Sequence, residues 1–464
     1  MNLLLVLLLL IAAPLLPANE SRPNIVFILA DDMRPDCIRT LGHKLIETPH
    51  LDSLVRTGFV FSRAVAGYPI CHVSRSEILS GTSAFRNGVQ YRGKTIDPAL
   101  KTLPVSLKEA GYRTWYSGKW HNDGTPTTRG YEATRGLYSS GGGKGNAMLP
   151  DNAGRKATGY TGWTFKTNEG HAEPDKGIGL TPDTDRFIGD AAVEVIQQQH
   201  SKPFFLHVNF TSPHDPRILP RGFEKKYAAA QVPLPPGFLP QHPFDHGNLS
   251  GRDELLLPKP LDEGELRSEL SVYYACISNV DAQVGRIIEA LRETKQFDHT
   301  IIVFSSDQGL ALGSHGLLGK QNLYEHTFRV PLIFHGPGIK AGTRSDADCY
   351  LRDVFPTICE LARIPIPETV RSPGLAALLG GGTKPVHEFV VGCFTDAQRA
   401  IRQGHWKLIH YPLIDKTQLF NLRDDPYELR DLSGQAEQAP ILRLLREKLQ
   451  LWLVAEGDPF VRPN

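Results

Sequence analysis

The chain has 464 residues, and its 51 Lys and Arg side chains almost balance its 50 Asp and Glu side chains, so the formal net charge is +1 at pH 7. This balance excludes a protein that binds polyanions by bulk charge, and we expect no nucleic-acid partner. With 41% hydrophobic and 22% charged residues, the composition is that of a globular protein, not of a disordered chain or a multi-span membrane protein. The length suits two or three domains, or one large α/β domain with a smaller one attached.

The chain begins with an apolar segment. Residues 3–16 are Leu, Ile, Val and Ala apart from one Pro, and no charged residue precedes Glu20. This run is shorter than the ~20 residues that a transmembrane helix needs. We therefore interpret residues 1–18 as a signal peptide and expect an exported protein, secreted or periplasmic, with no stable membrane span after signal cleavage. An uncleaved membrane anchor is the alternative.

The next elements in the chain indicate an α/β fold. Continuous apolar runs predict buried strands at residues 24–29, 203–210, 300–305 and 330–334, and a further strand is predicted at 113–117. Capping residues and helical spacing predict helices at 49–58, 74–81, 104–110, 186–199 and 263–295. Residues 122–180 and 213–260 are rich in Gly, Ser, Thr or Pro, and we expect long loops over a site there. Strands that alternate with helices favour a large, mostly parallel central sheet flanked by helices.

From about residue 385 the pattern changes. Short strands with turn residues between them are predicted at 388–392, 400–403, 406–411 and 418–421, and an amphipathic helix at 440–456. This pattern predicts a small C-terminal antiparallel sheet with a terminal helix. The expected domains are the signal peptide (1–18), the main α/β domain (19–384) and the C-terminal subdomain (385–464).

Polar side chains directly follow four of the predicted strands. In chain order they are Asp31 and Asp32, Lys119 and His121, His214, and Asp307 and Gln308. Ligand sites in open α/β sheets form outside the carboxyl ends of the strands. If these four strands are neighbours, their polar groups converge on one site.

The acidic residues of this set suit a metal ion. Three carboxylates and an amide oxygen are ligands for a hard divalent cation, Ca²⁺ or Mg²⁺. Without a cation, Asp31, Asp32 and Asp307 would repel one another. Either segment alone is also typical of a turn or a helix cap. Their occurrence after two similar strands favours a metal site.

Cys71 precedes the predicted helix at 74–81. A helix N-terminus stabilises anions and lowers the pKa of a thiol. Arg75 follows one helical turn later and can face the same site. The alternative is that Cys71 is a small buried apolar residue, as most lone cysteines are. The pairing of the six cysteines stays open, because their spacing does not select a connectivity, and no Cys-x-x-Cys of a zinc site occurs.

Five segments together resemble the formylglycine-dependent (type I) sulfatase family, in the family's order. Cys71-His72-Val73-Ser74-Arg75 resembles the signature Cys-x-Pro/Ala-Ser-Arg, and Asp31-Asp32 resembles the first metal pair. The other similar segments are Gly-Lys-Trp-His at 118–121, Ser-Asp-Gln-Gly at 306–309 with the lysine at 320, and Leu-Phe-Asn-Leu at 419–422 with Asp425, Pro426 and Glu428. The chain departs from the family at Val73, where the signature has Pro or Ala, and at Gln308, where Asn or His is common.

The resemblance implies a fold like that of alkaline phosphatase and a nucleophile made after translation. Cys71 would be oxidised to formylglycine by a formylglycine-generating or anaerobic sulfatase-maturing enzyme. The metal, Ca²⁺ rather than Mg²⁺, would be bound by Asp31, Asp32, Cys71, Asp307 and Gln308.

The resemblance also implies roles for the basic residues. Arg75 would hold the formylglycine, and His121 would contact its hydroxyl. Lys119 and Lys320 would bind sulfate oxygens, and His214 would bind the substrate and protonate the leaving alcohol.

The expected function is hydrolysis of a sulfate monoester, on a sulfated carbohydrate or another sulfate ester. Two alternatives stay open. One is a phosphoesterase or phosphonate hydrolase on the same fold. The other is a non-catalytic protein that binds a sulfated glycan and keeps Cys71 unmodified.

Overall fold

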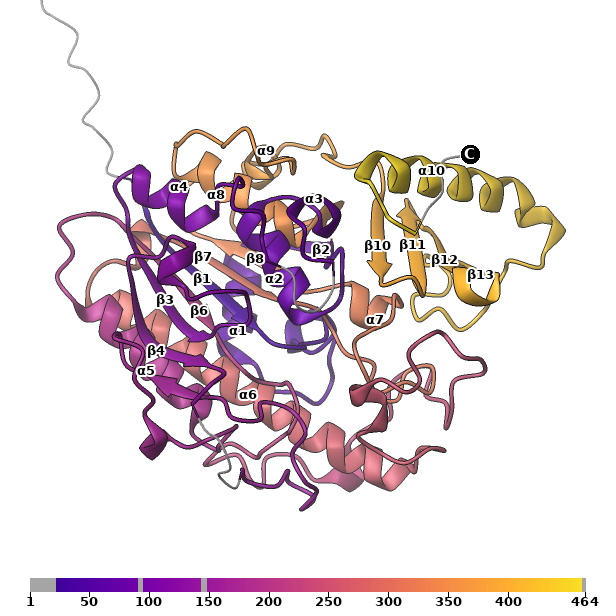
Figure 1. Ribbon diagram of the computed structural model, residues 1–464, viewed down its shortest axis with the longest axis horizontal. Coiled ribbons are helices and arrows are strands. Elements are labelled where there is room, and N and C mark those ends of the chain that lie inside the picture. The colour runs from indigo at the N-terminus through magenta and orange to yellow at the C-terminus, as the bar shows by residue number, and fades with distance from the viewer. Residues whose placement is uncertain (1–21, 91–94, 143–147, 461–464) are drawn as a thin grey trace, which may run out of the picture.

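A nine-stranded sheet forms the centre of the larger part of the protein, and a four-stranded sheet stands beside it (Figure 1). The structure is a computed structural model that describes residues 22–90, 95–142 and 148–460. The predicted signal peptide at 1–18 lies outside these residues. None of the described helices is long and apolar enough to cross a membrane.

The large sheet has the strand order β5-β4-β3-β6-β1-β7-β8-β2-β9. Its central strands β3, β6, β1 and β7 are all parallel, whereas β8 is antiparallel to both neighbours and β5 is antiparallel to β4. The predicted mostly parallel sheet is therefore confirmed. The strands are β1 (Asn24–Ala30), β2 (Phe59–Val65), β3 (Arg113–Lys119), β4 (Ala133–Ser139), β5 (Thr164–Lys166), β6 (Phe204–Asn209), β7 (Thr300–Ser306), β8 (Leu332–His335) and β9 (Thr343–Tyr350).

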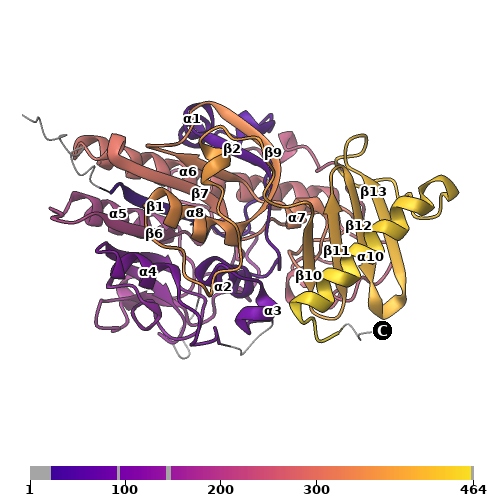
Figure 2. The same cartoon turned by 90° about the horizontal axis from the view of Figure 1, so that it is seen from above.

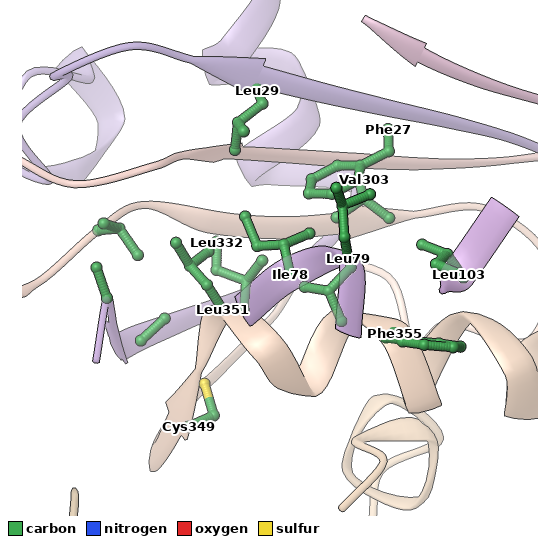
Figure 3. Close-up of a cluster of buried hydrophobic side chains, with 14 of the residues drawn as sticks. Phe27, Leu29, Ile78, Leu79, Leu103, Val303, Leu332, Cys349, Leu351 and Phe355 are labelled. Atoms are coloured by element: carbon green, nitrogen blue, oxygen red, sulfur yellow. The ribbon is translucent and has the colours of Figure 1, made fainter. Parts of the chain in front are cut away.

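Helices cover both faces of the large sheet, which explains the continuous apolar sequence of β1. Phe27 and Leu29 of β1 belong to the core shared with α2 (Cys71–Ser80), α4 (Leu103–Glu109) and α8 (Val354–Leu361). Figure 3 shows Phe27 above Ile78 and Leu79 of α2 in this core. The alternate residues of β1 face the core shared with α1 (Pro49–Thr57), α5 (Thr184–Gln197) and the 31-residue α6 (Glu263–Glu293). Three short helices complete the large part, α3 (Ala84–Asn87), α7 (Glu325–Phe328) and α9 (Ala376–Leu379).

The small sheet is antiparallel, with the order β10-β11-β12-β13, as predicted. It consists of β10 (Val390–Phe394), β11 (Gln398–Gln403), β12 (Trp406–Tyr411) and β13 (Lys416–Asn421), followed by α10 (Ala439–Glu456). Figure 2 shows α10 lying across this sheet. Ile401 and Leu408 share a core with Leu445 and Leu449 of α10, whereas Ala400 and Ile409 on the opposite face pack with Phe328 of the large part. The domain boundary at 384/385 falls between α9 and β10 and stays a prediction.

The sequence patterns missed some elements. The segment predicted as loops at 122–180 contains β4 and β5, and β2, β9 and α8 were not predicted. β9 has the sequence TRSDADCY and is one of the two edge strands of the large sheet. Its first residues alternate between exposed and half-buried, so it lacks the apolar run that marks the central strands. All six cysteines lie within the described residues and are free, buried thiols.

Candidate active site

The predicted convergence of polar groups is present. Because β3, β6, β1 and β7 are consecutive parallel neighbours, their carboxyl ends meet at one edge of the sheet. The polar residues at these carboxyl ends lie in or beside one cluster. Cys71 and Arg75 of α2 and Lys320 of the loop after β7 lie in the same cluster.

Three carboxylates and one thiol form the centre of this cluster. One ligand atom from each of Asp31, Asp32, Asp307 and Cys71 lies within 4.8 Å of the others, and all four residues are buried. Asp32 has a left-handed backbone (φ 68°), which is uncommon for a residue other than glycine. Its N–H donates to Asp307 Oδ1 at 3.1 Å. This hydrogen bond ties the ends of β1 and β7 together.

The donor set fits a hard divalent cation. Gln308 places Nε2 2.6 Å from Asp32 Oδ1 and 3.1 Å from Cys71 Sγ, while its buried Oε1 has no hydrogen-bond partner. A half-turn of this amide puts Oε1, an oxygen ligand, in the place of Nε2. The centre then holds carboxylate and amide oxygens, which are the ligands of Ca²⁺ and Mg²⁺.

Each carboxylate also has a buried cation beside it. Lys119 Nζ forms an ion pair with Asp31 Oδ2. Lys320 Nζ lies 2.7 Å from Asp32 Oδ2, and Arg75 Nε lies 2.9 Å from Asp307 Oδ2. Burial raises the pKa of Asp31, but Lys119 and its cationic neighbours outweigh burial and hold this pKa well below its usual value. For Asp32, burial dominates over Lys320 and raises the pKa to about 7.

Cys71 is the first residue of α2, and its Sγ lies 3.3 Å from Asp31 Oδ1. The position at a helix N-terminus predicts a lowered thiol pKa. In the structure the pKa of Cys71 is instead raised well above its usual value, because burial and the charge of Asp31 both disfavour a thiolate. Unmodified Cys71 is therefore a protonated thiol.

His214 lies beside Asp32, and the backbone of Asp215 holds its imidazole ring. Its Nδ1 donates to the Asp215 backbone carbonyl at 2.5 Å, which leaves Nε2 on the side of Asp32, 3.8 Å from Oδ2. Burial and Lys320 lower the pKa of His214 to about 3, which favours the neutral imidazole. This differs from the near-neutral pKa that favours a histidine proton donor, and the physical reason is desolvation among cations. A bound anion would raise this pKa.

A cavity of about 680 Å³ opens onto this centre. Both predicted loop segments contribute to its wall, with Tyr160 and Trp163 from one and Arg252 and Asp253 from the other. His121 also lines the cavity, where its ring centroid lies 5.3 Å from that of Trp163 and 5.8 Å from that of His72. Burial, followed by Lys119, lowers the pKa of His121 well below its usual value.

Sequence reasoning missed several polar residues of the site. Asn209, the last residue of β6, accepts a hydrogen bond from Arg75 at 2.8 Å, and its place at a strand end is a signal that could have identified it. Tyr160 donates to Asp31 at 2.5 Å, and Arg252 bridges Asp215 and Asp253. Tyr160 and Arg252 lie in irregular segments where no local pattern marks them.

The sequence matches two family models and several known proteins. A family model described as Sulfatase matches residues 23–364, and a model described as N-sulphoglucosamine sulphohydrolase, C-terminal, matches residues 313–453. An arylsulfatase of Clostridium perfringens is 28% identical over 465 residues, covering 92% of this chain and 94% of its own.

Two solved structures share the fold. One, a protein in complex with its substrate D-glucosamine-2-N,6-O-disulfate, has a TM-score of 0.78 at 24% identity and covers 94% of this chain and 99% of its own. The other, a phosphonate monoester hydrolase from Silicibacter pomeroyi, also has a TM-score of 0.78, at 20% identity, and covers 95% of this chain and 96% of its own. These likenesses confirm the alkaline phosphatase-like fold predicted from the sequence.

Proposed function

Because the chain belongs to the sulfatase family and is a sulfuric ester hydrolase, we propose that it hydrolyses a sulfate monoester with a formylglycine made from Cys71 beside one divalent metal ion. The observation that carries this proposal is the meeting of Asp31, Asp32, Asp307 and Cys71 within 4.8 Å, next to a cavity that Cys71 lines. Ca²⁺ is the preferred ion, with Mg²⁺ second, held by these four residues and Gln308. When present, the two groups supply a hydrated aldehyde as nucleophile and positive charge beside the sulfate oxygens.

The basic residues of the centre bind the sulfate group. Lys119 and Lys320 lie in the cavity wall. Lys119 pairs with Asp31 and Lys320 pairs with Asp32, and both aspartates are proposed metal ligands. Asp31 and Asp32 would share their negative charge with the metal ion that they hold, which would leave Lys119 and Lys320 able to donate to sulfate oxygens. Charge that develops on the ester in the transition state is stabilised by these fixed cations. Arg75 lies one turn after Cys71 on α2 and holds Asp307, and it would hold the formylglycine.

His214 donates the proton to the leaving alcohol. The Asp215 carbonyl keeps a proton on Nδ1, so Nε2 is the atom that takes up and gives the mobile proton. The sulfate ester is an anion, and its arrival beside Nε2 favours the charged imidazolium. His121 also lines the cavity, where it would contact the formylglycine hydroxyl.

The proposed substrate is a sulfated carbohydrate. A cavity of about 680 Å³ is within the size range of small-molecule sites. The rings of Tyr160 and Trp163 offer an apolar wall, and Asn122, Asn248 and Gln321 offer polar contacts. The structural relative crystallised with a disulfated glucosamine supports this class of substrate. We further propose that a sulfatase-maturing enzyme oxidises Cys71 although Val73 occupies the signature position, and that the protein is exported.

Relative activity on three esters tests this proposal. Matured protein should hydrolyse an aryl sulfate with a kcat/KM about tenfold or more above that for the matching aryl phosphate, because two lysines, one arginine and one metal suit a monoanionic ester better than a dianionic one. The matching phosphonate monoester, which is a monoanion like the sulfate, tests the preference for sulfur over phosphorus at equal charge. Cys71→Ala should abolish turnover, whereas Cys359→Ala, a buried thiol outside the cavity, should keep it. Preference for the phosphorus esters would favour the phosphonate hydrolase alternative. Sulfate-ester binding without turnover, unchanged in Cys71→Ala, would favour the non-catalytic one.

A further inference from the structure

Tyr160 has an unusual conformation at the centre of the site. Its backbone φ is 55°, a left-handed value that bulky side chains rarely adopt and that clusters at functional positions. The residue is buried (7% exposed), lines the cavity and donates its hydroxyl hydrogen to Asp31 Oδ2 at 2.5 Å.

The two oxygens of Asp31 have different surroundings. Oδ1 faces the cluster, 3.3 Å from Cys71 Sγ. Oδ2 receives two donors, the Tyr160 hydroxyl and the Lys119 ammonium group. These two donors fix the rotation of the Asp31 carboxyl group, so that Oδ1 faces the other proposed metal ligands.

The surrounding chain holds Tyr160 in place. The preceding residue, Gly159, runs so close to the Asp215–Arg252 ion pair that a Cβ there would lie 2.7 Å from the Asp215 carbonyl oxygen and 2.9 Å from Arg252 Nη1. The Tyr160 ring packs edge-on to the rings of His214 and Trp163, at centroid distances of 4.9 and 5.0 Å. Lys119 Nζ lies 5.0 Å from the centroid of the same ring. These contacts on several sides of the ring therefore hold Tyr160 in its left-handed backbone conformation.

We propose that Tyr160 is a positioning residue that orients Asp31 toward the divalent metal. This inference rests on the proposed function, in which Lys119 turns to a sulfate oxygen. Once Lys119 has turned, the Tyr160 hydroxyl is the donor that remains at Asp31 Oδ2 among the described contacts. Tyr160 thus keeps Asp31 in its binding orientation while substrate is present. Hydrogen-bond partners of metal ligands typically change metal affinity by about 10- to 100-fold when removed.

The test is the Ca²⁺ affinity of Tyr160→Phe, which removes the hydroxyl and keeps the ring. Tyr138→Phe is the matched control, because Tyr138 is a buried neighbour with a ring centroid 5.8 Å from that of Tyr160 and a hydroxyl without a hydrogen-bond partner. Chelator-treated proteins are titrated with CaCl₂ in a calorimeter, with and without sodium sulfate. We expect the dissociation constant to rise about tenfold or more in Tyr160→Phe and to stay within about twofold in the control.

Thermal unfolding separates positioning from folding. The Ca²⁺-induced rise in the unfolding midpoint should shrink in Tyr160→Phe, whereas a purely structural role would lower the midpoints with and without Ca²⁺ equally. A Ca²⁺ dissociation constant of Tyr160→Phe within about twofold of the wild-type value overturns the inference alone. A wild-type protein that binds neither Ca²⁺ nor Mg²⁺ overturns the proposed metal site, and the inference with it.

Discussion

Lys320 and Asp32 are 288 positions apart in the chain, yet Lys320 Nζ lies 2.7 Å from Asp32 Oδ2. Both side chains are buried, and the contact joins the end of β1 to the loop that follows β7. The ammonium group pairs with the Asp32 carboxylate and also lies in the cavity wall. Under the proposed function, the same lysine pairs with Asp32 and binds a sulfate oxygen of the substrate.

Replacing Lys320 by Met should lower kcat/KM for an aryl sulfate by about 10- to 100-fold, since a hydrogen bond to a charged group contributes about 1.5–3 kcal/mol. Steady-state kinetics measures this change. Lys225→Met, at an exposed position, is the control and should leave kcat/KM within about twofold. A Lys320→Met enzyme as active as this control would contradict the sulfate-binding role.

Asp307→Asn should remove most of the bound divalent metal, because it takes away one of three carboxylates at the centre. Metal content after dialysis, measured by plasma emission spectroscopy, reports this loss. Asp298→Asn, which changes an exposed carboxylate, should retain the wild-type metal content. Equal metal content in the wild type and Asp307→Asn would refute the proposed ligand set.

His214→Ala should affect alkyl sulfates far more than activated aryl sulfates. A poor leaving group needs the proton, and a general acid typically contributes about 100-fold or more, whereas a nitrophenolate leaves without it. The measurement is kcat/KM for one ester of each type in wild type and variant. Equal losses on both esters would be incompatible with His214 as the proton donor.

Arg402→Met should lower the unfolding midpoint of the whole protein. Arg402 on β11 is fully buried and lies 2.8 Å from Glu325 of α7 and 2.7 Å from Asp348 of β9. Removing the cation leaves two buried carboxylates without this partner, which costs about 3–5 kcal/mol. Thermal denaturation compares this variant with Arg443→Met, at an exposed position of α10. Similar midpoints for the two variants would show that the ion pairs do not secure the small sheet.

The strands that position the site could be predicted from the sequence because they are buried on both faces. The apolar runs of β1, β6 and β7 are visible in the sequence, and the polar residues after them are visible as exceptions to those runs. Whether the four strands are neighbours is not a local property, and the structure supplies that fact. The edge strand β9 has a polar sequence and gives no such signal.

The residues of the cavity wall were beyond sequence reasoning for a related reason. Tyr160 and Arg252 line the cavity only because long, mostly irregular segments fold back over the sheet. The lowered pKa of His214 and the raised pKa of Cys71 likewise depend on burial among many charges, which no spacing in the sequence encodes.

The proposed function requires that Cys71 become the nucleophile by oxidation. The most direct test is the mass of the tryptic peptide from Ala64 to Arg75, isolated from protein made in its native host. We predict that this peptide carries an aldehyde, as formylglycine or its hydrate, in place of the Cys71 thiol. An unmodified thiol at Cys71 in a preparation that hydrolyses sulfate esters would contradict the formylglycine nucleophile.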